Sequence, residues 1–220
     1  MPVPGKQAAE VLEFWFVQSR PRQWFAKDPA FDALLRERFL GLTRRAIAGE
    51  LDAWGREAAG GLALVLLLDQ VPRQIWRGTA MAFAGDPQAL ALSLRAVELG
   101  WLEAEPEQAR RQFWLMPLMH SEDLAVQEAA LPLFERYSDP RTADFARRHR
   151  DVIAHFGRFP QRNSSALTPW APERWAADCH TYQEGDLWGR LSPCLLQLPA
   201  STAGNRRVEA RRPQSAQIQH

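Results

Sequence analysis

The sequence GLALVLLLDQVPR, residues 61–73, is the most apolar stretch of the chain and decides its fold. Its leucine-rich run contains a single β-branched residue, Val65. Because β-branched residues favour strands and leucine does not, the composition predicts a buried helix over residues 61–70 rather than a buried strand. A carboxylate, an amide and a guanidinium follow the leucines, so this helix ends in polar groups that need partners.

Three Asp-Pro steps lie on either side of this stretch. An aspartate can cap the N-terminus of a helix, and a proline at the first helical position has no N–H to leave unpaired. Apolar residues at helical spacing follow each step, and a glycine then ends the run. The three steps therefore predict helices over residues 29–49, 87–100 and 140–157.

Apolar periodicity predicts two more helices, over residues 8–16 and 106–115. Ser121 is expected to cap another helix, which runs to about Tyr137. No hairpin signal separates these segments. We therefore predict an all-α domain over residues 1–163 with about seven or eight helices.

The chain has 27 basic and 26 acidic side chains, which gives a formal net charge of +1. A protein that coats duplex nucleic acid needs a clear basic excess, so we expect no nucleic-acid partner. The longest apolar run, residues 62–68, is far shorter than the ~18 residues of a membrane span, and no export signal is visible. We expect a cytoplasmic protein without membrane contact and leave its oligomeric state open.

The composition changes near residue 163. Residues 164–220 contain both cysteines, too few for a disulfide scaffold, and keep no helical or strand period. Arginine outnumbers lysine 25 to 2 in the chain, which is typical of a GC-rich genome, where shifted reading frames yield Arg, Pro, Trp and Cys. We expect an irregular tail, either frameshifted or disordered, that carries no function.

Four motifs stand out along the first 163 residues. They are VLEFWF (11–16), LLLDQVPRQIWRG (66–78), MPLMHSED (116–123) and HFGRFPQRN (155–163). In order and spacing they resemble the bacterial family catalogued as domain of unknown function 924. The resemblance implies an all-helical fold of the tetratricopeptide-like superfamily and a family without an established activity.

The chain departs from that family after its last motif. In the family, the Arg-Asn pair is followed by a Leu-Gly-Arg turn and an acidic helix capped by Thr or Ser. This chain continues with SSALTPW, residues 164–170. The departure removes a C-terminal helix from the fold and is a second reason to regard the tail as aberrant.

The polar end of the leucine-rich helix is the first candidate site. In one interpretation, Arg73 binds an anionic ligand while Asp69 and Gln70 help to orient it. In the other, Asp69 and Arg73, four positions apart, form an ion pair that fixes the turn at Pro72. Both interpretations stay open.

His120, Ser121 and Glu122 imitate a catalytic triad, but neighbours at a helix start do not face one another. Ser121 is explained by capping. His120 is either an acid or base or a solvated or backbone-bonded histidine, and Glu122 is a candidate ligand contact. His149 falls on the apolar side of its predicted helix and is either a core histidine or a ligand contact. It lies six positions from His155, too far around the helix for a shared metal, and we predict no metal site.

Arginines are dense between residues 141 and 163, where the formal charge is +4. Arg158, Arg162 and Asn163 follow the predicted end of the last helix. They form either an anion clamp, because a planar guanidinium suits phosphate and carboxylate, or a solvated basic surface.

Three functions are therefore considered. The preferred hypothesis is a polar pocket, containing arginines, that binds a small anionic ligand or a peptide carboxylate. The second is an enzyme that uses a histidine as acid or base and arginines to stabilise an anion. The third is a protein-interaction scaffold whose polar motifs serve only folding. None of the three calls for a cofactor.

Overall fold

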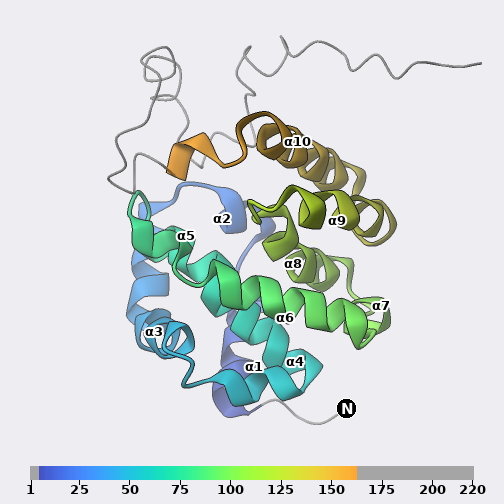
Figure 1. Cartoon of the computed structure of the whole chain (residues 1–220). Coiled ribbons are helices and arrows are strands. Elements are labelled where there is room, and N and C mark those ends of the chain that lie inside the picture. Colours follow the sequence, from blue (N-terminus) through green and yellow to red (C-terminus); the bar gives the residue numbers. More distant parts are fainter. Residues whose placement is uncertain (1–4, 163–220) are drawn as a thin grey trace, which may run out of the picture. The chain divides into compact units, whose positions relative to one another are not determined.

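The computed structural model describes residues 5–162, and within them the chain is helical, without a strand (Figure 1). The predicted all-α fold is confirmed, while the tetratricopeptide-like label stays a prediction. The predicted tail, residues 164–220, lies outside the described residues. The α-helices of the described region are α1 (Lys6–Glu13), α2 (Pro21–Phe25), α3 (Pro29–Ile47), α4 (Ala58–Val65), α5 (Val71–Ile75), α6 (Asp86–Glu98), α7 (Trp101–Ala104), α8 (Gln108–Met119), α9 (Leu124–Tyr137) and α10 (Pro140–Phe156).

Every predicted helical run is helical in the structure. The leucine-rich run is α4 followed by a π-helical turn over Leu66–Gln70, in which the backbone winds more widely than in an α-helix. Three helices were not predicted: α2, α5 and α7 have only four or five residues, too few for periodicity to reveal. The described region therefore holds ten α-helices where seven or eight were expected.

All three Asp-Pro steps begin helices as predicted, and two of the three aspartates cap them. Asp28 caps α3 and Asp139 caps α10, each by accepting hydrogen bonds from two N–H groups of the first turn. The third step is different. Asp86 is the first residue of α6 and makes no capping bond, because its carboxylate binds Arg73 instead. A charge-assisted bond to a guanidinium is stronger than one to a backbone N–H.

The predicted cap at Ser121 is wrong. Helix α9 begins three residues later and is capped by Asp123, whose carboxylate accepts from the N–H of Ala125 at 2.9 Å. A carboxylate at this place also complements the helix dipole, which a hydroxyl does not. The hydroxyl of Ser121 accepts from the N–H of Asp123 at 3.1 Å. Glu122 consequently lies outside the helix, in the turn before it.

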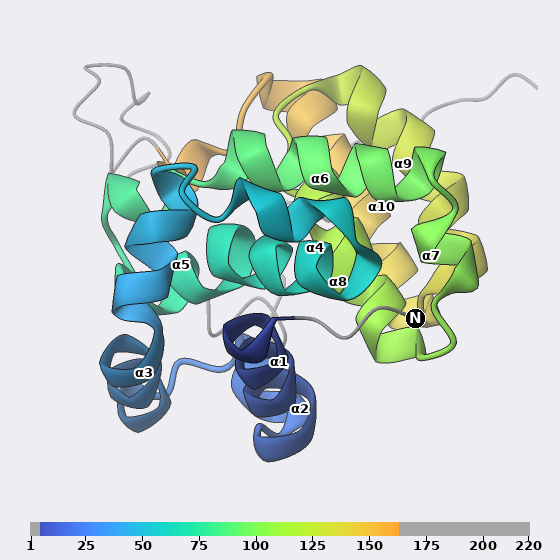
Figure 2. The same cartoon turned by 90° about the horizontal axis from the view of Figure 1, so that it is seen from below.

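The chain from α4 to α5 runs through the middle of the described region (Figures 1 and 2). Helix α4 packs on α1, α6 and α8, and α5 packs on α3. Helix α9 packs on both α8 and α10. Each side chain from Leu62 to Leu68 is at most 1% exposed, so the predicted buried helix is confirmed and supplies the centre of the core. None of the helices within residues 5–162 has the length and apolar character that crossing a bilayer requires.

Candidate functional site

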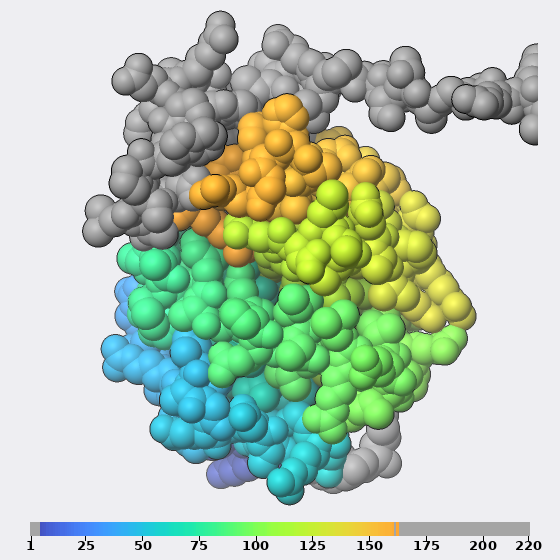
Figure 3. All heavy atoms as spheres, viewed as in Figure 1, coloured from blue at the N-terminus to red at the C-terminus, as the bar shows by residue number. Residues whose placement is uncertain are grey.

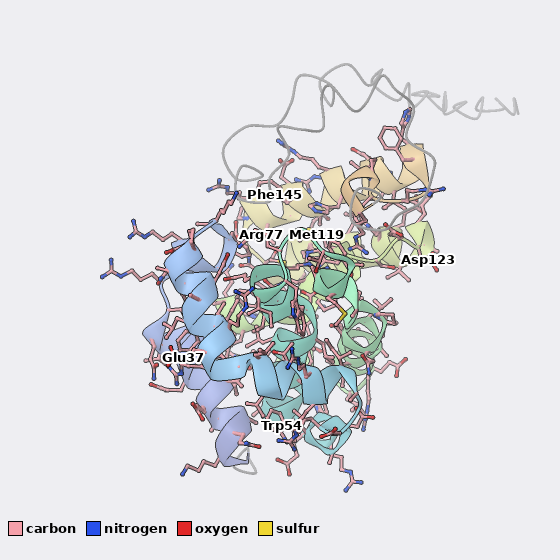
Figure 4. All side chains as sticks on the ribbon, turned by 90° about the vertical axis from the view of Figure 1, so that its left-hand side faces the viewer. Glu37, Trp54, Arg77, Met119, Asp123 and Phe145 are labelled. Atoms are coloured by element: carbon pink, nitrogen blue, oxygen red, sulfur yellow. The ribbon has the colours of Figure 1, made fainter. Side chains whose placement is uncertain are left out.

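A pocket with a cavity volume of about 120 Å³ lies where α5 meets the end of α8 and the side of α10. One water needs only ~15 Å³, so the pocket has room for a small organic molecule. Figure 4 shows Arg77, Met119 and Phe145, which belong to three separate elements, close together at the pocket, whereas Trp54 lies far from them. The polar lining residues are Gln70, Arg73, Gln74, Arg77, His120, His149 and Arg162. The apolar lining residues are Trp24, Phe25, Ala26, Phe83, Met116, Met119, Phe145 and Phe159.

Asp69 lies directly behind the pocket wall, in the π-helical turn, with no exposed surface. Its carboxylate accepts from Nδ1 of His120 at 2.7 Å and from Nε2 of Gln70 at 2.6 Å, and Nη1 of Arg73 lies 3.1 Å away. Burial by itself raises the pKa of the Asp69 carboxyl. The charges of Arg73 and His120, together with the hydrogen bonds, outweigh burial and hold that pKa well below its usual range. Asp69 is therefore ionised.

His120 follows the last residue of α8 and is partly buried. An ionised carboxylate only accepts hydrogen bonds, so Nδ1 of His120 carries a proton and donates a hydrogen bond to Asp69. The bond fixes the orientation of the ring in the pocket wall. Its Nε2 atom accepts a hydrogen bond when the ring is neutral and donates one when the ring is protonated.

His149, on α10, is another lining residue of the pocket. Burial, and after it the charges of His120, Arg162 and Arg73, lower the pKa of His149 to about 4, although its hydrogen bond to Phe145 acts to raise that pKa. The ring is thus neutral near pH 7. Its Nδ1 atom donates to the carbonyl oxygen of Phe145 at 2.8 Å, since a carbonyl cannot donate. Nε2 of His149 is therefore an acceptor without a proton.

Arg73 and Arg162 share one carboxylate, Asp86. Arg73 binds it through two hydrogen bonds of 2.9 and 3.0 Å, and Nη2 of Arg162 lies 3.1 Å from its Oδ2 atom. Figure 3 shows the orange end of the described chain, which carries Arg162, packed against the green segment that carries Asp86. Arg162 also donates to the carbonyl oxygen of His120 at 3.0 Å.

The guanidinium of Arg162 lies between two aromatic rings. Its central carbon is 4.6 Å from the ring centre of Phe83 and 4.9 Å from that of Phe159. Burial lowers the pKa of Arg162, and the charge of Asp86 raises it in part. Arg162 is therefore a desolvated cation whose plane is fixed by its neighbours.

Two lining residues on the α5 side were not predicted. Arg77, just after α5, binds Asp32 of α3 through two hydrogen bonds of 3.2 and 3.1 Å. Gln74 donates Nε2 to the carbonyl oxygen of Trp24 at 3.0 Å, while its buried Oε1 atom has no partner within residues 5–162. The spacing of Gln70, Arg73, Gln74 and Arg77, at positions i, i+3, i+4 and i+7, is the signal that would have placed all four on one helix face.

The structure brings most of the predicted site residues together. Gln70, Arg73, His120, His149 and Arg162 line the pocket, and Asp69 supports them from behind. Glu122 does not line the pocket. Its carboxylate accepts a hydrogen bond of 2.9 Å from the backbone N–H of Phe159, which is a lining residue. Arg158 is exposed and does not line the pocket. Asn163 lies outside the described residues. Three or more histidine, cysteine or carboxylate side chains do not gather anywhere in the described region in a way that could hold a metal ion.

Comparison with known proteins finds one family and one solved structure. Residues 11–168 match the family described as bacterial protein of unknown function DUF924. A solved structure of a protein of unknown function from Agrobacterium tumefaciens is similar, with 39% sequence identity and a TM-score of 0.71. The match covers 77% of this chain and 95% of that one. No curated protein matches the sequence.

Proposed function

The chain belongs to the DUF924 family of bacterial proteins of unknown function, as its four motifs predicted, and we propose that its pocket binds a small anionic ligand. The observation that carries the proposal is the chemistry of the wall. Every polar side chain that residues 5–162 contribute to the wall is a guanidinium, an imidazole or an amide, and no carboxylate is among these described lining residues. The carboxylates that pair with these groups, Asp32, Asp69 and Asp86, lie behind the wall.

The carboxylates fix the direction of the cationic groups. A guanidinium presents its N–H donors in a planar fork, and a bidentate partner such as Asp86 sets the plane of that fork before a ligand arrives. Donors that are already oriented bind an anion without the cost of ordering long side chains. Arg162, desolvated between Phe83 and Phe159, is the cation with most to gain from an added negative charge.

The rest of the wall sets the character of the ligand. Eight of the lining residues are apolar, five of them aromatic: Trp24, Phe25, Phe83, Phe145 and Phe159. Such a surface stabilises an apolar body by burial, while a few polar groups fix its orientation. The proposed ligand therefore has an anionic end and an apolar or ring-shaped body. A cytoplasmic location stays part of the proposal.

Direct calorimetric titration of the full chain with small carboxylates and phosphates tests this function. Arg162→Gln is the informative variant, and Arg44→Gln is the matched control because Arg44 is exposed and not a lining residue. A charge-assisted hydrogen bond contributes about 1.5–3 kcal/mol, so we expect affinity to fall about 10- to 100-fold in Arg162→Gln and to stay unchanged in Arg44→Gln. Absence of binding to any anion, or equal loss in both variants, overturns the proposal and favours the scaffold hypothesis.

One observation favours an enzyme as the second candidate. The carboxylate of Asp69 holds Nδ1 of His120, which is how an aspartate fixes the tautomer of a general acid or base. If the bound anion is a substrate, His120→Gln will keep the affinity for it and abolish its turnover. Loss of affinity and turnover together would make His120 a binding residue.

A further inference from the structure

We infer that the ligand is a hydroxylated anion: besides its charged group it carries at least one uncharged hydroxyl, which donates to an acceptor of a lining residue, Gln74 Oε1 or His149 Nε2. This inference rests on the proposed anion-binding function and narrows the class of ligand. It comes from two polar atoms of the described wall that their own hydrogen bonds assign as acceptors; Oε1 of Gln70, whose Nε2 donates to Asp69, is assigned in the same way. Guanidinium groups can only donate hydrogen bonds, whereas these acceptors can only receive them.

The first acceptor is the amide oxygen of Gln74. The side chain is 5% exposed, and its Nε2 is committed to the carbonyl oxygen of Trp24, which can only accept. This bond assigns the other end of the amide as Oε1, and that atom is buried without a partner among residues 5–162. A buried acceptor without a donor costs about 1–3 kcal/mol, and because Gln74 is a lining residue, a ligand that brings a donor is favoured there.

The second acceptor is Nε2 of His149. The bond from Nδ1 to the carbonyl of Phe145 puts the single proton of the neutral ring on Nδ1. The low pKa of His149, about 4, keeps the ring neutral over the physiological range. Nε2 of His149 is thus available for a donor, and a second anionic oxygen placed there would meet a lone pair rather than a proton.

The charges around His149 select a neutral donor over an ammonium group. Arg73, Arg162 and the ring of His120 all disfavour a positive charge at His149, and an ammonium in the pocket would face the same cations. The carboxylates that could offset it, Asp69 and Asp86, are already bound to those cations. A hydroxyl donates equally well without adding charge. The ligand is accordingly a hydroxy acid or a phosphorylated alcohol rather than an amino acid.

Two pairs of probes, each differing in hydroxyl content, test the inference by calorimetry on the full chain. The carboxylate pair is 3-phenylpropionate and 3-phenyllactate, and the phosphate pair is propyl phosphate and glycerol 3-phosphate. In at least one pair, we expect the hydroxylated member to bind about 10-fold tighter, because an unpaired acceptor penalises the analogue that lacks the donor. Phenylalanine, with an ammonium in place of the hydroxyl, should bind more weakly than phenyllactate.

A matched pair of variants assigns the effect to Gln74. Gln127 is also a buried glutamine with an unpaired Oε1, but it does not line the pocket. Gln74→Met should bring the affinity ratio within the preferred pair towards one while the anion still binds, and Gln127→Met should leave the ratio unchanged. His149→Phe changes a second lining residue and should also reduce this affinity ratio. It tests the inference even if Gln74→Met does not fold.

The outcomes separate this inference from the proposed function. Binding of both members with equal affinity overturns the hydroxyl inference and leaves anion binding intact. A ratio that neither Gln74→Met nor His149→Phe changes also overturns it, as does phenylalanine binding tighter than phenyllactate. If none of the probes binds, the proposed function fails and the inference fails with it.

Discussion

Nδ1 of His120 lies 2.7 Å from Oδ1 of Asp69, although the two residues are 51 positions apart. The bond joins the end of α8 to the π-helical turn of the leucine-rich segment. Asp69 has no exposed surface and also contacts Arg73 at 3.1 Å and Gln70 at 2.6 Å, so one buried carboxylate orients three side chains of the pocket wall. Asp69 therefore fixes the positions of the lining side chains that it contacts.

Neutralising Asp69 should destabilise the protein strongly. Asp69→Asn keeps the size of the side chain but removes the fully buried one of the two carboxylates that pair with Arg73, and breaking a buried ion pair costs about 3–5 kcal/mol. The free energy of unfolding in urea measures the loss. Asp144→Asn is the control, because Asp144 pairs with Arg148 at the surface, where an ion pair contributes ~1 kcal/mol or less. Equal effects in the two variants would contradict the role given to Asp69.

His149 should make the protein less stable as the pH falls from 7 to 5. Its pKa is about 4 in the folded protein against 6.5 for an unperturbed histidine, so the unfolded chain binds more protons between these values. The stability from the neutral ring is complete above pH 6.5 and is lost as the pH falls towards 4, with a loss of roughly 2 kcal/mol at pH 5.

The variant His149→Phe tests the source of that pH dependence. Asp69, whose pKa lies below its usual range, loses its contribution only at lower pH, so it does not mask the effect between pH 7 and 5. Unfolding in urea at pH 7 and pH 5 should give a smaller difference in the variant than in the natural sequence. The same difference in both proteins would show that His149 is not buried and neutral.

Asp86 should couple Arg73 energetically to Arg162. Asp86→Asn is expected to cost about 2 kcal/mol, because both guanidiniums lose a charged partner and then face each other's charge. In that background, Arg162→Met should cost about 1–2 kcal/mol less than it does alone. A double-mutant cycle from urea unfolding measures this difference, and strictly additive costs would mean that Arg162 does not depend on Asp86.

Gly85 should be intolerant of any side chain. A Cβ atom there would lie 2.4 Å from the carbonyl oxygen of Leu68, inside the π-helical turn next to Asp69. We expect Gly85→Ala to lower the free energy of unfolding by about 1–3 kcal/mol through forced backbone movement. Gly41→Ala, on α3, meets nothing within 4 Å and should stabilise the protein by up to ~1 kcal/mol. Equal melting temperatures of the two variants would show that the backbone at Leu68 moves away from the new Cβ atom without loss of stability.

Local signals in the sequence were sufficient for most of the fold. The buried helix over 61–70 follows from leucine content, and the caps at Asp28 and Asp139 follow from the pairing of aspartate with proline. Asp86 carries the same local signal but binds arginines from distant segments, which no local pattern can reveal. Helices of four or five residues were not predicted, because they are too short to show a repeated apolar period.

The candidate site was found in part because its residues are polar at the edge of apolar runs. That criterion selected Asp69, Arg73 and His120, which the fold does bring together. It could not separate Arg158 from Arg162, since both follow the same helix in the same arginine-rich turn. The difference is tertiary: Arg162 lies between two aromatic rings and reaches Asp86, whereas Arg158 is exposed.

The most direct test of the central claim is a nuclear magnetic resonance titration of the histidine rings in the full chain. 3-Phenyllactate or glycerol 3-phosphate is added at constant pH, and the ring signals of His120, His149 and His155 are followed. The first two line the pocket, whereas His155 is exposed on α10 and serves as the internal control. We predict saturable shifts of the His120 and His149 signals with the His155 signal unmoved. No shift, or parallel shifts of all three signals, would contradict an anion-binding pocket.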